Sequence, residues 1–214
     1  MNPIRRMKRV FDTFFIDYNR WTKSFESDKN YMDILQKIPE SPVNTSSIAL
    51  SLVKPKSAVL SAGCGAGREV KYLTEILNCK VTAIDCSQKM VSLSKINAPN
   101  AKYLLGDMVK FRSPEKFDYI VCIWNTINFI PTFAGRKQFI KNCYENLKEE
   151  GRLILTTSHR YSHWRSFLHF IIYANKNYYP SPKQIERWFE GTQFKIYKTR
   201  IDSNILIYAR KEKK

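Results

Sequence analysis

An apolar run that ends in three closely spaced glycines occupies residues 57–67, with the sequence Ser57-Ala58-Val59-Leu60-Ser61-Ala62-Gly63-Cys64-Gly65-Ala66-Gly67. The apolar part predicts a short buried strand. The glycines let a ligand approach the backbone, and the helix expected from Arg68 directs its amide groups and positive dipole end at that ligand. Asp85 ends the next apolar stretch, where a carboxylate can accept both hydroxyls of a ribose. The pattern predicts a site for a nucleoside cofactor.

Strands and helices alternate along the middle of the chain. We expect strands at 57–62, 81–85, 101–106, 117–124 and 152–157, and helices at 68–78, 87–97 and 135–149. Ser87 is expected to cap the second of these helices, and Gly151 to end the third. Short connections of this kind require parallel strands with right-handed crossovers.

Both ends of the chain depart from this alternation. Near the carboxyl end, Ser181-Pro182-Lys183-Gln184 predicts a helix start. Strands at 194–201 and 205–210 then follow, and the short turn between them predicts an antiparallel hairpin. At the amino end, apolar spacing predicts helices at 4–25, 29–38 and 46–53, which we interpret as a helical cap.

The spacing of the glycines distinguishes between cofactor families. It is G-x-G-x-G, and the last glycine of the dinucleotide fingerprint G-x-G-x-x-G would fall on Arg68. With this spacing, residues 57–67 resemble the first motif of the class I S-adenosylmethionine-dependent methyltransferases. Four other stretches resemble the second acidic motif, the adenine-binding segment, the fourth strand and the entry to the fifth strand of that family: 81–87, 105–108, 117–121 and 150–153. The resemblance covers roughly residues 55–211.

The resemblance implies a fold and a domain organisation. The expected fold class is α/β, a Rossmann-like three-layer αβα sandwich. Its seven-stranded sheet would be mostly parallel, with an antiparallel C-terminal hairpin strand. Residues 55–214 would form the methyltransferase domain, and residues 1–54 an N-terminal helical cap that belongs to the same domain.

The resemblance also implies how S-adenosylmethionine, with S-adenosylhomocysteine as product, is bound. Gly63, Cys64 and Gly65 would lie along the methionine part. Asp85 would take the ribose hydroxyls. The adenine would meet Cys86, Asp107, which accepts from its amino group, and Met108, which packs on the ring. Residues 123–125, beginning with Ile123, would face the sulfonium.

Ser61 departs from the family pattern. Many members carry an acid at this position, which orients the cationic amino-acid end of the cofactor, whereas Ser61 brings no charge. Glu69 is expected to be a poor substitute because it lies inside the following helix.

The acceptor is expected beyond the fourth and fifth strands. Trp124 is predicted to form a wall of the methyl site, with Asn125 beside it, and His159 is a candidate general base. No Asp or Glu lies close in sequence to His159 and His163, and no CxxC pair occurs, so we predict no metal site. The Asn/Asp-Pro-Pro-Tyr/Phe signature of amino-directed nucleic-acid methyltransferases does not occur after the fourth strand.

Composition leaves the acceptor class open. The net charge of +17 favours an anionic partner such as nucleic acid. The cysteine number is odd and we recognise no secretory signal, so we expect a reducing cytoplasm, and the longest apolar run is too short to span a bilayer. Three functions remain: a methyltransferase with a small-molecule substrate, an RNA methyltransferase, or a non-catalytic S-adenosylmethionine-binding protein, which Ser61 suggests. The oligomeric state is open.

Overall fold

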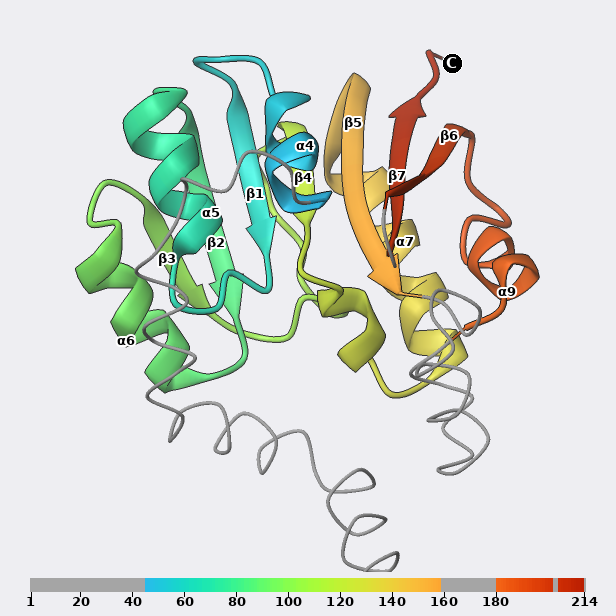
Figure 1. Ribbon diagram of the computed structural model, residues 1–214, viewed down its shortest axis with the longest axis horizontal. Coiled ribbons are helices and arrows are strands. Elements are labelled where there is room, and N and C mark those ends of the chain that lie inside the picture. The colour runs from blue at the N-terminus through green and yellow to red at the C-terminus, as the bar shows by residue number, and fades with distance from the viewer. Residues whose placement is uncertain (1–44, 159–179, 202–203, 214) are drawn as a thin grey trace, which may run out of the picture. The chain divides into compact units, whose positions relative to one another are not determined.

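Figure 1 shows the protein as a computed structural model, in which residues 45–158, 180–201 and 204–213 are described. The helices predicted at 4–25 and 29–38 lie outside the described residues, as does the segment 159–179. The cap therefore stays a prediction, apart from its last helix, α4 (Thr45–Ser51).

The described strands form one sheet. In chain order they are β1 (Ala58–Ala62), β2 (Lys80–Asp85), β3 (Lys102–Leu105), β4 (Phe117–Cys122), β5 (Leu147–Ser158), β6 (Phe194–Ile201) and β7 (Asn204–Lys211). Their order across the sheet is β3-β2-β1-β4-β5-β7-β6. Neighbouring strands from β3 to β5 are parallel, and β7 is antiparallel to both β5 and β6. The predicted sheet, with its antiparallel terminal hairpin, is confirmed.

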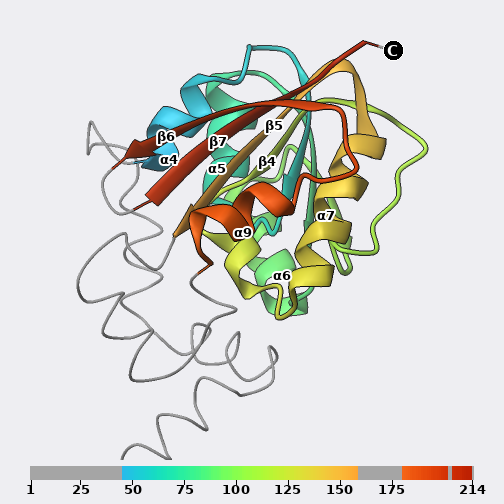
Figure 2. The same cartoon turned by 90° about the vertical axis from the view of Figure 1, so that its right-hand side faces the viewer.

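Helices cover both faces of the sheet (Figure 1). Besides α4 they are α5 (Arg68–Lys71), the π-helical turn η1 (Tyr72–Ile76), α6 (Gln88–Asn97), the short η2 (Thr126–Phe129), α7 (Phe133–Asn146) and α9 (Pro182–Arg187). Figure 2 views the sheet from its β6 edge, and there α4 and α5 lie on one face and α7 and α9 on the other. This is the predicted three-layer αβα arrangement.

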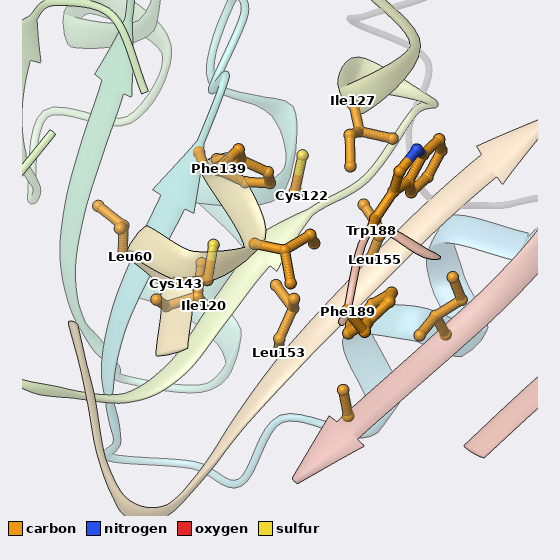
Figure 3. Close-up of a cluster of buried hydrophobic side chains, with 14 of the residues drawn as sticks. Leu60, Ile120, Cys122, Ile127, Phe139, Cys143, Leu153, Leu155, Trp188 and Phe189 are labelled. Carbon is orange, nitrogen blue, oxygen red and sulfur yellow. The ribbon is translucent and has the colours of Figure 1, made fainter. Parts of the chain in front are cut away.

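The alternation of side chains along the strands divides the core into two clusters, one on each face. On β1, Leu60 belongs to the cluster beneath α7 and α9, while Val59 belongs to the cluster beneath α4 and α5. Figure 3 shows Phe139 of α7 and Trp188, just after α9, together with Leu60 in the first cluster. The central strands are buried on both faces, as their nearly continuous apolar sequences require.

The prediction that Gly151 ends the third helix is wrong. α7 ends at Asn146, and β5 begins at the next residue. Gly151 lies inside β5, at a bulge in the pairing with β4. A Cβ at this position would come within 2.8 Å of the carbonyl oxygen of Lys148, so the glycine serves a close approach of backbone within the bulge.

Two other predicted boundaries differ from the structure. The helix predicted at 68–78 becomes π-helical from Tyr72, where the hydroxyl of Thr74 donates to the carbonyl of Val70 at 2.9 Å and competes with the backbone ladder. The strand predicted to reach residue 124 ends at Cys122. It stops there because the next-but-one residue, Trp124, turns into the left-handed region of backbone space.

Candidate cofactor site

The glycine loop, residues 63–67, lies at the carboxyl end of β1 and is held by neighbouring elements. The amides of Gly63 and Cys64 donate to the carbonyl of Ile84 at 2.8 Å and 3.1 Å. From α6, the side-chain amide of Asn97 donates to the carbonyl of Ala66 at 2.9 Å. These bonds fix the loop before any ligand is present.

Two of the loop glycines are required by the protein's own packing. Gly63 has φ +78°, and a Cβ there would come within 2.3 Å of Cγ2 of Thr126 in η2. Gly67 has φ +92°, and a Cβ there would come within 2.5 Å of Oγ of Ser94 in α6. Side chains would therefore be excluded at both positions even if no ligand bound, a role that the sequence pattern alone did not indicate.

Asp85 ends β2 and joins it to the glycine loop. One carboxylate oxygen accepts from the amide of Gly65 at 2.9 Å, and the other from the amide of Ser87 at 3.0 Å. Burial raises the pKa of Asp85, and these two backbone hydrogen bonds oppose that rise. The oxygen bonded to Gly65 keeps a further acceptor position, whereas the other also accepts a long, weak hydrogen bond from the thiol of Cys86 at 3.8 Å. The carboxylate is thus oriented, and it can accept two hydroxyls if a ligand replaces the contact with the thiol.

Glu69 and Ser61 meet below the loop, although Glu69 lies inside the following helix. The hydroxyl of Ser61 donates to a carboxylate oxygen of Glu69 at 2.9 Å. Both side chains are buried, at 1% and 4% exposure. Position 69 is inside the helix, as predicted, but it is in the first turn of α5, and from there its side chain reaches back to the end of β1. A carboxylate is therefore present beside Ser61.

The other predicted cofactor residues lie at the carboxyl ends of β1, β2, β3 and β4, with different exposure. Cys64 is buried in the loop, whereas Cys86 is exposed beside Asp85. After β3, Asp107 is exposed and accepts from the amide of Val109 at 2.8 Å. Met108 is partly buried against the cluster beneath α7 and α9. Ile123 follows β4 but is 3% exposed, with its side chain in the opposite cluster.

Trp124 and Asn125 form a strained turn after β4. Their φ angles are +60° and +58°, values that residues other than glycine rarely adopt. Trp124 is 41% exposed, and the guanidinium of Arg68 lies 4.0 Å from the centre of its ring. This contact connects the end of β4 with the start of α5. Consecutive residues in a costly conformation are typical of a functional site.

Comparison with known proteins identifies the domain. A sequence model of the methyltransferase domain family matches residues 59–151. The magnesium protoporphyrin IX methyltransferase of Synechocystis, solved with bound S-adenosylmethionine, superposes with a TM-score of 0.65 at 17% identity, over 92% of this chain and 98% of that one. Residues 59–151 therefore match a methyltransferase domain, as the predicted resemblance to the class I S-adenosylmethionine-dependent methyltransferases implies, and the predicted fold class is confirmed.

Two curated proteins are also similar to this chain in sequence. The ubiquinone biosynthesis O-methyltransferase of Coxiella burnetii is 27% identical over 150 residues, which is 66% of this chain and 60% of that protein. Phosphoethanolamine N-methyltransferase 3 of Arabidopsis thaliana is 26% identical over 157 residues, 72% of this chain and 27% of that protein. The chain thus spans at most 60% of the length of these two relatives.

A buried polar network, which the sequence did not indicate, joins η2 to α7 and to the end of β5. Asn128 of η2 donates to the hydroxyl of Ser158 at 3.1 Å and accepts from the hydroxyl of Thr157 at 2.8 Å. Arg136, 2% exposed, donates from α7 to the carbonyls of Ile127 and Asn128. The only signal in the sequence was an arginine on the apolar face of a predicted helix. The network holds η2 against the end of β5.

The predicted catalytic histidine lies in a part of the chain that the structure does not describe. His159 and His163 lie outside the described residues, so the candidate base stays a prediction. Among the described residues, no group of three His, Cys, Asp or Glu side chains is placed to hold a metal ion. Within the same residues, no helix has the length and apolar character needed to cross a membrane.

Proposed function

We propose that this methyltransferase transfers the methyl group of S-adenosylmethionine to a small-molecule acceptor. The observation that carries the proposal is the meeting, at one edge of the sheet, of a fixed glycine loop, the oriented carboxylate of Asp85 and the strained turn at Trp124 and Asn125. Ligands of parallel α/β sheets bind at the carboxyl ends of the strands, which is where these groups lie.

The cofactor-holding residues are assigned by their chemistry and position. Gly63, Cys64 and Gly65 line the methionine part with backbone, and Asp85 accepts the two ribose hydroxyls. The adenine lies near Cys86, Asp107 and Met108, with Asp107 accepting from its amino group. Asp107 is exposed and so can take a ligand donor in addition to the amide of Val109. Ile123 is buried, so its backbone, rather than its side chain, would border the sulfonium.

The bound cofactor supplies a methyl group that is already activated by a positive sulfur. The task left to the protein is alignment of donor and acceptor, with a base if the acceptor carries a proton. Trp124 provides an apolar wall beside the methyl group. Asn125 is held by a hydrogen bond of 2.9 Å from its amide nitrogen to Oδ1 of Asn204 and orients the acceptor. His159 is the proposed base.

Two curated relatives support a small acceptor. Their names specify methyl transfer to an oxygen in ubiquinone biosynthesis and to the nitrogen of phosphoethanolamine. The two acceptors differ in element and in shape, so we propose the size class and leave the acceptor atom open.

RNA is the second candidate acceptor, and the net charge of +17 favours it. A phosphate-binding surface of that charge would give RNA affinity that falls steeply with salt concentration. The non-catalytic alternative depended on Ser61. Its main motivation weakens, because the carboxylate of Glu69 lies 2.9 Å from the Ser61 hydroxyl.

The test is transfer of labelled methyl from S-adenosylmethionine into a cell extract, followed by separation of metabolites, RNA and protein. We expect the label in the metabolite fraction, and expect Asp85→Ala to abolish it. Label that nuclease treatment releases from RNA would favour the second candidate. Active-site variants that are folded and incorporate as much label as the wild type would contradict the site assignment.

A further inference from the structure

We infer that Glu69, joined to Ser61, carries the negative charge that binds the cationic amino group of the cofactor's methionine part. The inference rests on the proposed function and names a binding residue that the family resemblance does not provide. In the family pattern the acid stands at the position of Ser61. In this chain the acid is Glu69, in the first turn of α5, and its side chain reaches the end of β1.

Glu69 lies beside the end of β1, where the family acid would stand. Ser61 is the penultimate residue of β1, two residues before the glycine loop. The carboxylate of Glu69 lies within 2.9 Å of its hydroxyl oxygen. The pair therefore offers a carboxylate and a hydroxyl at the place where an aspartate or glutamate on β1 would offer a carboxylate alone.

Glu69 is buried and has no cationic side chain bonded to it within the part of the chain that the structure describes. It is 4% exposed. Its donors are its own backbone amide and the hydroxyl of Ser61, and neither carries a charge. A buried carboxylate with only neutral donors is costly, and proteins retain such groups at functional sites. Burial raises the pKa of Glu69 to about 7. An incoming ammonium group would supply the missing partner.

The electrostatic surroundings do not provide that partner in advance. Asp85 raises the pKa of Glu69 and the neighbouring Arg68 lowers it, each less than burial does. Among the described residues, Cys64, Cys122 and Tyr103 also interact with Glu69 electrostatically. Their pKa values are all raised, mainly by burial, so they are neutral near pH 7. Asp85 and Glu69 together make the site favourable for a cation.

The geometry of the hydrogen bond assigns a role to Ser61. Its single proton is directed at Glu69, so the lone pairs of its oxygen are left to accept from the ammonium group. Ser61 thus acts as a bridge between ligand and carboxylate. A matched test follows, because moving the acid back to position 61 should replace Glu69.

The experiment is calorimetric titration of the full chain with two ligands. S-adenosylhomocysteine has the amino-acid part, and 5′-methylthioadenosine lacks it while keeping the ribose and adenine. Three variants are compared with the wild type: Glu69→Gln, which keeps the shape, Ser61→Asp combined with Glu69→Gln, and the control Glu75→Gln. Glu75 is an exposed acid in the adjoining η1. Circular dichroism establishes that each variant is folded.

We expect Glu69→Gln to weaken S-adenosylhomocysteine binding about 10- to 100-fold, the range for loss of a charged hydrogen bond. Binding of 5′-methylthioadenosine should change less than about threefold, the double variant should recover most of the loss, and Glu75→Gln should match the wild type. Equal losses for both ligands, or unchanged affinity in folded Glu69→Gln, would overturn the inference while leaving the proposed function intact. A wild type that binds neither ligand would overturn the proposed function itself.

Discussion

The hydroxyl of Ser61 donates a hydrogen bond of 2.9 Å to the buried carboxylate of Glu69. This relationship joins the end of β1 to the first turn of α5, across the loop that identifies the family. It places an acid beside the one family position where the sequence lacks it. Its first consequence concerns stability.

Stability should depend on pH through Glu69. Burial raises the pKa of this group to about 7 in the folded protein, so the folded state holds the proton more tightly than the unfolded state. The stability that proton binding to Glu69 adds to the folded state is fully present below the ordinary carboxyl pKa. It is lost as the pH rises through 7. A shift of this size corresponds to about 3 kcal/mol. We expect Glu69→Gln to be more stable than the wild type at pH 8 and similar to it at pH 4.5.

Urea unfolding at several pH values measures this difference. Glu75→Gln serves as the control, because Glu75 is exposed in the same helical segment. Asp85 has the same sign of shift and is retained in both variants, so some pH dependence will remain. If the free energies of unfolding of the wild type and of Glu69→Gln change with pH in the same way, Glu69 is not a buried acid with a raised pKa.

Cofactor binding should depend on Asp85. Asp85→Ala removes the two acceptor positions offered to the ribose and also releases the amide of Gly65. We expect the affinity for S-adenosylhomocysteine to fall by about 100-fold or more, since two hydrogen bonds to a charged acceptor are lost. Calorimetry measures the change, with the exposed Glu115→Gln as a control. Retained affinity in folded Asp85→Ala would remove Asp85 from the site.

Gly63 should tolerate a side chain only if Thr126 is trimmed. Gly63→Ala places a Cβ 2.3 Å from Cγ2 of Thr126 at a φ of +78°, so we expect a loss of about 3 kcal/mol in unfolding free energy. Thr126→Ser removes Cγ2 but keeps the hydroxyl that donates to the carbonyl of Ile123. The double variant should recover part of the loss. Additive effects in a double-mutant cycle would argue against this contact.

At position 124, glycine should destabilise the protein less than alanine does. At φ +60°, glycine adopts the native backbone without strain whereas alanine does not. We expect Trp124→Gly to be more stable than Trp124→Ala by about 1 kcal/mol, the reverse of the order in a helix. Both should lose methyl-transfer activity if the ring forms the wall of the methyl site. Denaturant unfolding measures the order, and an alanine variant that is the more stable would show that the turn relaxes.

Much of the fold was predictable because its signals are local. The strands of the sheet follow from apolar runs, the cap at Ser87 from its hydroxyl, and the capping box at Ser181 and Gln184 from their spacing. Gly151 was misassigned because a glycine suits both the end of a helix and a bulge in a strand. Only the pairing of β5 with β4 distinguishes the two.

The sequence by itself determined the family resemblance, the order of the elements and the position of Asp85. These depend on residue type and short-range spacing, which the chain carries along its length. Only the tertiary structure decided where the missing acid is, which neighbours require Gly63 and Gly67, and how Asn128 and Arg136 hold η2. Each of these contacts joins different elements, and its geometry exists only when the helices pack on the sheet. Glu69 reaches Ser61 for that reason, because α5 folds back over the strand that precedes it.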